Sequence, residues 1–216
     1  MNRELVMAKT MAFVKRSLMG AEGGHDWSHT KRVWKMAEKI GSKENCDMLV
    51  VELAALLHDI ADAKFHGGDE TIGSKVAYDF LVETGVDTKT TKHVCDIVAN
   101  ISWKGGEASK LSTTEFKVVQ DADRLDGIGA IGIARTFNYG GFKGRELYNP
   151  DIPPKLNMTK EEYRSSTAPT LNHFYEKLLL IKDRIHTETG KRIAEDRHKY
   201  LTGFLEQFLG EWDSCR

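Results

Sequence analysis

A histidine and two aspartates stand at the end of an otherwise apolar run, and their residue types could hold a metal ion or move a proton. The run reads Ala55-Leu-Leu-His58-Asp59-Ile-Ala-Asp62. From Leu49 onward the chain is apolar nearly all round, which predicts a buried helix. Burying charge is costly unless the charged group is paired or binds a metal. His58, Asp59 and Asp62 therefore need partners from elsewhere in the chain.

Two further helices are expected to place a polar side chain on a face that should be buried. The helix expected over about 26–43 has Val33 on its apolar face, and His29 lies one turn earlier. A later helix has Val119 on its inward stripe, and Asp123 lies one turn beyond it. Three helices could thus bring polar groups to one interior position.

The four side chains, two imidazoles and two carboxylates, form a mixed nitrogen and oxygen donor set. Such a set suits Mn, Fe, Co, Ni or Zn, with Mg weaker because of the histidines. An ion with open positions could hold water and a phosphate oxygen, as a hydrolase requires. A lone histidine on an apolar face is more often a hydrogen-bonded core residue, and Asp123 could instead cap its helix or pair with Arg124. Periodicity by itself leaves both interpretations open.

The order of these residues resembles that of the HD superfamily of metal-dependent phosphohydrolases, which are all-helical enzymes. Further segments resemble a bacterial nucleotide-hydrolysing subgroup: His25-Asp-Trp-Ser-His29 with Arg32-Val33, Asp121-Ala-Asp-Arg-Leu-Asp126, the glycine-rich 127–134, Phe137-Asn-Tyr-Gly-Gly141 and His173-Phe-Tyr-Glu-Lys-Leu178. The resemblance covers most of the chain from residue 25 to residue 180. It implies metal ligands at His29, His58, Asp59 and Asp123, the last being the acid followed by Arg-Leu.

The resemblance also implies an activity on phosphoric ester or anhydride bonds. The leading hypothesis is a (deoxy)nucleoside triphosphate pyrophosphohydrolase that uses metal-activated water. The alternatives are a phosphatase or phosphodiesterase on another phosphate ester, alarmone hydrolases included, and a non-catalytic nucleotide-binding module. One divalent ion is expected, with manganese first and Mg, Co, Ni, Fe and Zn as alternatives. A second ion would need histidines where the chain has Asn100 and Ser102, and His93 is interpreted as a helix-edge residue.

Acidic residues and one histidine near the implied ligands complete the expected site. Asp62 shares a helix face with His58 and Asp59 and resembles the general acid/base of related phosphohydrolases. A surface acid at a helix end is the alternative. His25 and Asp26 precede the first ligand and could fix its tautomer, although an N-cap role for Asp26 would look the same.

Cationic side chains could offset the charge of a polyphosphate substrate. Arg32 and Lys64 lie close in sequence to ligands, so they are the expected catalytic cations. Arg135 is expected to bind substrate, and His173 and Lys177 are assigned to substrate binding by the resemblance. Taken alone, each of these side chains is more often solvated.

The elements that position these residues are expected to be helices, because no strand pattern competes with the helical periodicity. We expect an all-α protein, a single globular HD-domain helical bundle over residues 1–216 with about eight or nine helices. The helix starts are marked by Asp26 or Ser28, by Asp47, and by a capping box from Ser112 to Glu115. The last two helices are expected over about 171–185 and 193–212.

Prolines and glycines interrupt this pattern once. All four prolines fall between residues 150 and 169, after Gly140, Gly141 and Gly144. A connection of this length is typical of a functional flap, so a flexible flap is expected at about 138–168.

Composition bounds the partners and the compartment. The chain has 216 residues with a net charge of -1, which favours neither a nucleic-acid polymer nor a membrane surface as a partner. Its three cysteines form no CxxC motif, and charges scattered through residues 1–20 interrupt the apolar core that a signal peptide would need, so a reduced, cytoplasmic location is expected. The expected partner is a small-molecule nucleotide or another phosphate substrate, and a homodimer is left open.

Overall fold

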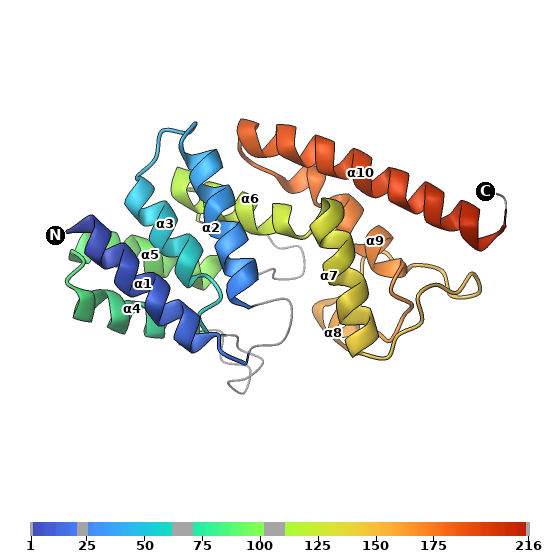
Figure 1. The fold of residues 1–216 in the computed structure, drawn as a ribbon, viewed down its shortest axis with the longest axis horizontal. Helices are drawn as coiled ribbons and strands as arrows, with labels where there is room; N and C mark the ends of the chain where they lie inside the picture. Colours follow the sequence, from blue (N-terminus) through green and yellow to red (C-terminus); the bar gives the residue numbers. More distant parts are fainter. Residues whose placement is uncertain (1, 21–25, 62–70, 102–110, 215–216) are drawn as a thin grey trace. The chain divides into compact units, whose positions relative to one another are not determined.

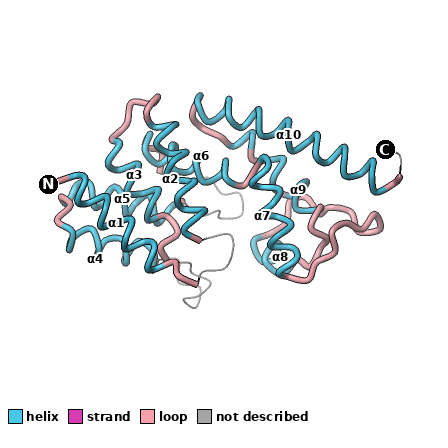
Figure 2. Tube along the Cα trace, in the orientation of Figure 1, coloured by secondary structure: helices cyan, strands magenta, loops and turns pink. Residues whose placement is uncertain are grey.

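The computed structural model describes residues 2–20, 26–61, 71–101 and 111–214. Within these ranges the chain is helical and has no strand (Figure 2), so the all-α prediction is confirmed. The chain divides into two compact units, Met1–Ala122 and Asp123–Arg216, which are described separately. That the chain forms one domain stays a prediction. No helix in the described ranges is both long and apolar enough to cross a membrane.

A buried helix lies at the centre of the first unit. The helices of this unit are α1 (Arg3–Ser17), α2 (Trp27–Gly41), α3 (Met48–Leu57), α4 (Ile72–Thr84), α5 (Thr88–Asn100) and most of α6 (Thr114–Asp126). In Figure 1, α3 packs against α1, α2 and α5, while α4 pairs with α5. Every residue of α3 from Val50 to Leu57 is buried. The one charged residue among them, Glu52, forms an ion pair with Arg3 of α1.

Side chains and backbone groups define where these helices begin. The Asp26 carboxylate accepts from the His29 N–H at 2.8 Å, and that of Asp47 accepts from the Leu49 N–H at 2.9 Å. Both aspartates are therefore N-caps, as predicted. The predicted capping box at Ser112 is wrong by one residue, because the Thr113 hydroxyl accepts from the Phe116 N–H at 3.3 Å. The expected acid of that box, Glu115, instead accepts from the Asp47 N–H at 2.8 Å and links the starts of α6 and α3.

The second unit contains one long helix and several short ones. After the last turn of α6 it comprises α7 (Gly129–Phe142), α8 (Lys160–Ser165), α9 (Asn172–Glu176), the 3₁₀ turns η2 (Leu178–Leu180) and η3 (Lys182–Arg184), and α10 (Glu188–Trp212). The prediction of one helix over 171–185 is wrong. Lys177 has φ -142° and ψ -54°, which ends α9, and tighter 3₁₀ turns continue the chain. Phe137 of α7 packs against Phe204 and Phe208 of α10, with ring centroids 5.9 and 6.1 Å apart.

The segment predicted to be a flap is partly helical. Helix α7 extends to Phe142 and α8 covers Lys160–Ser165, so the irregular connection is 143–159. Hydrogen bonds tie it to the start of α9, because the Thr170 N–H donates to the Glu146 carbonyl at 2.8 Å and the Leu171 N–H donates to the Leu147 carbonyl at 3.0 Å. The flexibility of this segment stays a prediction.

Candidate metal centre

Two buried histidines from neighbouring helices face each other in the first unit. His29 lies in the first turns of α2, and His58 lies directly after α3. Their Nε2 atoms are 3.3 Å apart, and the residues are only 1% and 6% exposed. The packing of α2 against α3 brings them together. Histidine nitrogens at this separation can act together on one ion or one proton.

A backbone carbonyl sets the tautomer of His58. Its Nδ1 lies 2.8 Å from the Ala55 carbonyl oxygen, which can only accept, so Nδ1 carries the hydrogen. A neutral His58 ring then presents the lone pair of Nε2 toward His29. Metal-binding histidines commonly have the other ring nitrogen held in this way.

Asp59 adds a carboxylate to the pair. Its Oδ2 lies 3.4 Å from Nε2 of His29 and 3.4 Å from Nε2 of His58. The side chain of Asp59 is 25% exposed, whereas both imidazoles are buried. The group is therefore closed by protein on its histidine side and open to solvent beside the carboxylate.

The spacing of these three atoms suits a divalent metal ion. Adjacent ligands on an ion with bonds near 2.0–2.2 Å lie roughly 3.0–3.5 Å apart, and the three edges measured here are 3.3 to 3.4 Å. Each residue can also donate an unprotonated nitrogen or oxygen, in a combination that transition metals favour. The group of His29, His58 and Asp59 could therefore hold a metal ion.

The exposure of the acidic residues in the 121–126 cluster differs from the prediction. Asp123 was placed on the buried face of its helix, but it is partly exposed, while Asp121 and Asp126 are 0% and 5% exposed. Burial of Asp126 is offset by an ion pair with Arg135 at 2.7 Å. Asp123 begins the second unit, and its role as a fourth ligand stays a prediction.

The remaining predicted residues of the first unit divide into two groups. Asp62, Lys64 and His25 lie outside the residues that the structure describes, so their roles stay predictions. Asp26 holds the backbone of His29 by capping α2. Arg32 lies three residues after His29 in α2 and is partly exposed.

The predicted substrate-binding residues all belong to the second unit. Arg135 donates to the Asp126 carboxylate, a structural pairing that the sequence analysis did not anticipate. His173 lies 3.3 Å from the Tyr163 hydroxyl, and Lys177 Nζ lies 5.6 Å from the centre of the Tyr163 ring. Burial, aided by the positive charges of Lys177 and Arg145, lowers the pKa of His173 to about 3. His173 is therefore a neutral hydrogen-bonding group at physiological pH, beside two cations.

Sequence reasoning missed Tyr163 and Arg145 as neighbours of His173. Arg145 donates to the Ser166 carbonyl, and Tyr163 lies ten residues before His173. Both residues fall in the stretch from the end of α7 to Pro169, where no periodic pattern relates one side chain to the other. Only the folding of that stretch onto α9 could reveal them.

Within the described residues, the all-helical fold brings two buried histidines and a partly exposed aspartate into one group that could hold a metal ion. The family model of the HD domain matches residues 26–128. The Bacillus subtilis protein YpgQ is 38% identical over 208 residues, which span 95% of this chain and 93% of YpgQ. The chain belongs to the HD-domain family, and the predicted resemblance is confirmed.

Solved structures extend the similarity over nearly the whole chain. A Bacillus thuringiensis HD-superfamily hydrolase is 45% identical, with 98% of this chain and 99% of that chain covered and a TM-score of 0.78. The structure of Bacillus subtilis YpgQ in complex with ADP is 35% identical, with coverages of 95% and 96% and a TM-score of 0.74.

Proposed function

We propose that the protein is a metal-dependent phosphohydrolase that acts on nucleotides. The observation that carries this proposal is the group of His29, His58 and Asp59, whose ligand atoms lie within 4.8 Å of one another. Membership of the HD-domain family and the similarity to an HD-superfamily hydrolase support hydrolysis as the activity.

The residues of the chain would share the work around one divalent ion. His29, His58 and Asp59 hold the ion, and Asp123 is the proposed fourth ligand. When bound, the ion would activate water for attack and neutralise charge on phosphoryl oxygens. Manganese is the proposed metal, because two imidazoles and carboxylates together suit it better than magnesium.

Proton transfer and charge neutralisation are assigned to side chains near the ligands. Asp62 is the proposed general acid/base, since it follows Asp59 by three residues in the sequence and resembles the general acid/base of related phosphohydrolases. Arg32 and Lys64 are the proposed cations for the substrate phosphates. His173 and Lys177 of the second unit are the proposed substrate-binding residues, and burial with the positive charges of Lys177 and Arg145 keeps His173 neutral.

The proposed substrate is a (deoxy)nucleoside triphosphate, cleaved to a monophosphate and pyrophosphate. The ADP complex of YpgQ supports a nucleotide as the ligand class. The charge pattern agrees, because a triphosphate presents several anionic groups to the basic side chains named above.

A substrate panel with product identification tests the proposal. The manganese-loaded protein is incubated with nucleoside triphosphates, monophosphates and cyclic phosphodiesters, and the products are resolved by ion-exchange chromatography. Pyrophosphate released from triphosphates supports the proposal. Orthophosphate released only from monophosphates would replace it with a phosphatase, and nucleotide binding without turnover of any ester would indicate a binding module. Light scattering on the same sample tests the homodimer.

A further inference from the structure

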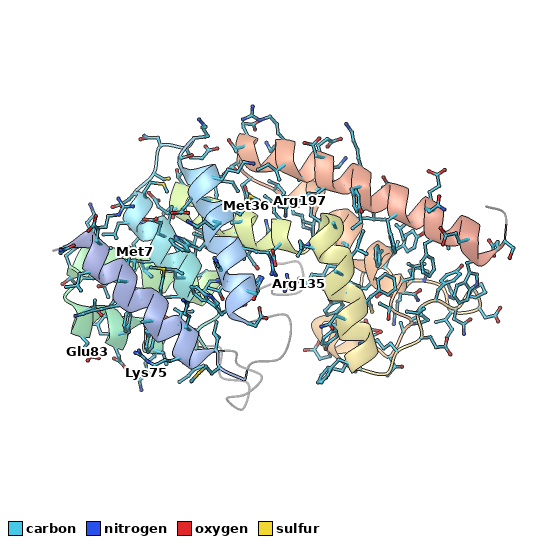
Figure 3. The ribbon with its side chains drawn as sticks, in the orientation of Figure 1. Met7, Met36, Lys75, Glu83, Arg135 and Arg197 are labelled. Atoms are coloured by element: carbon cyan, nitrogen blue, oxygen red, sulfur yellow. The ribbon has the colours of Figure 1, made fainter. Side chains whose placement is uncertain are left out.

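Three arginines contact the last turn of α6 or extend from it, and the contacts described next lie within the second unit. Arg197 of α10 donates to the Leu125 carbonyl. Arg135 of α7 lies 3.4 Å from the Asp126 carbonyl and 2.7 Å from its carboxylate. Arg124 itself donates to the carbonyl of Arg184, the last residue of η3. Figure 3 labels Arg135 and Arg197, which come from separate helices.

The stem of Arg197 is also held in place. Gly129 has φ +75°, and a Cβ added there would lie 3.0 Å from Cγ of Arg197 and 3.2 Å from its Cβ. Burial lowers the pKa of Arg197, while the carboxylate of Asp126 opposes that shift. The guanidinium is thus a partly buried cation with a packed stem and a fixed acceptor.

The last carbonyls of a helix have no partner within the helix, and cations are favoured at this end by the helix dipole. Arg197 supplies such a cation to the Leu125 carbonyl, two residues after Asp123. Asp123 therefore lies in the last turn of α6, and Arg197 contacts the backbone at the end of that turn.

We infer that Arg197 is a positioning residue for Asp123. It touches no proposed ligand side chain and acts by restraining the backbone from which Asp123 extends. This inference rests on the proposed function, in which Asp123 is the fourth ligand. Second-layer partners of metal ligands typically contribute 10- to 100-fold to metal affinity, so loss of the Arg197 contact should weaken manganese binding about ten-fold.

The test measures manganese affinity by titration calorimetry on the full chain, beside the thermal midpoint of each variant. Arg197→Met keeps much of the stem and removes the charge and donors, while Arg197→Lys keeps the charge. Leu205→Val, a buried position on the same helix, serves as the control for general loss of stability. Asp123→Asn and the Arg197→Met/Asp123→Asn double variant complete a cycle.

We expect Arg197→Met to lose manganese affinity about ten-fold. Arg197→Lys should recover part of that affinity, and Leu205→Val should keep the affinity of wild type. In the Asp123→Asn background, Arg197→Met should have no further effect. Suppose that Asp123→Asn binds manganese weakly. A wild-type manganese affinity in Arg197→Met, or an equal loss of affinity in Leu205→Val, would then overturn the positioning role alone. A wild-type affinity in Asp123→Asn would instead remove Asp123 from the ligand set, and the positioning role with it.

Discussion

The hydrogen-bonding state of His58 is set by a single backbone contact. Its Nδ1 hydrogen is donated to the carbonyl of Ala55, three residues earlier in the last turn of α3. The Nε2 lone pair is therefore presented to His29 and Asp59 without any long-range partner having to set the tautomer. An alanine at this position would remove both a proposed ligand and this internal contact.

We expect His58→Ala to lose manganese affinity by more than about 100-fold, because even outer partners of metal ligands contribute 10- to 100-fold. Hydrolytic activity should fall in parallel. The measurements are metal content by elemental analysis, affinity by calorimetry and phosphate release by chromatography.

The matched control for this variant is His93→Gln. His93 contacts the Thr113 hydroxyl at 3.0 Å and belongs to no proposed ligand group. It should keep metal affinity and activity within about two-fold of wild type, as expected for a substitution away from the site. Full metal content in a helical His58→Ala protein would contradict the ligand assignment.

The thiol of Cys95 should react slowly with alkylating agents. Burial raises its pKa to about 11, and only the thiolate is the nucleophile. At pH 8 we expect iodoacetamide to label Cys95 far more slowly than free cysteine, with labelling restored in denaturant. Peptide mass spectrometry over time measures the rate, and labelling as fast as for free cysteine would show that the site opens.

The neutral state of His173 should make stability depend on acid pH. Its pKa is lowered from an ordinary value near 6.5 to about 3, so between these values the unfolded chain binds a proton that the folded chain does not. This contribution to stability is complete above about pH 6.5 and is lost as pH falls toward 3.

The variant His173→Gln isolates this effect. Wild type should lose more unfolding free energy than His173→Gln when the pH is lowered from 7 to 4.5, as measured by urea denaturation. Parallel losses in the two proteins would mean that His173 is protonated in the folded state. The comparison cancels the titration of carboxylates that both proteins share.

At the scale of elements, two glycines of α7 differ in the space around them. A Cβ added at Gly132 would lie 2.2 Å from the Gly127 carbonyl oxygen, whereas nothing lies within 4 Å of one added at Gly141. The first glycine permits a close approach of backbone to backbone. The second has no such neighbour.

We therefore expect opposite effects from the same substitution in one helix. Gly132→Ala should destabilise the protein by about 1–3 kcal/mol, the usual cost of overpacking. Gly141→Ala, near the end of the helix, should be neutral or stabilise by up to about 1 kcal/mol through helix propensity. Chemical denaturation measures both, and a loss of stability in Gly141→Ala equal to that in Gly132→Ala would contradict the assignment.

For the molecule as a whole, metal binding should raise the free energy of unfolding. An ion that binds the folded chain at 100 times its dissociation constant adds about 2.7 kcal/mol. We expect that increase for manganese in wild type and none in His58→Ala, with EDTA reversing it. Thermal denaturation at several manganese concentrations measures the effect. Equal stabilisation of the two proteins would place the bound ion elsewhere.

Local patterns predicted most of the helices and the inward faces of three residues of the candidate site, while their roles as metal ligands came from the family resemblance. His29 and His58-Asp59 were placed by the helical period and by the apolar run before residue 58, and the structure brings their ligand atoms together. Asp47 was predicted as an N-cap and Asp26 as one of two candidates beside Ser28, because capping depends on a few neighbouring residues. Such features need only local geometry, which a sequence pattern can express.

Contacts between distant segments could not be predicted in this way. The break of the helix expected over 171–185 at Lys177, the pairing of Arg135 with Asp126 and the contact of Arg197 with the Leu125 carbonyl all depend on how separate segments pack. The partial exposure of Asp123 beside buried Asp121 is of the same kind.

The sequence by itself determined the helical class, the central apolar helix and the order of the histidine and aspartate residues. These follow from periodicity and from the cost of leaving polar groups unsatisfied in an apolar setting. Only the tertiary structure decided that His29 Nε2 lies 3.3 Å from His58 Nε2 and that Asp59 reaches both. The reason is physical: one helix sets the face on which a side chain lies, but the packing of α2 against α3 sets the distance across that face.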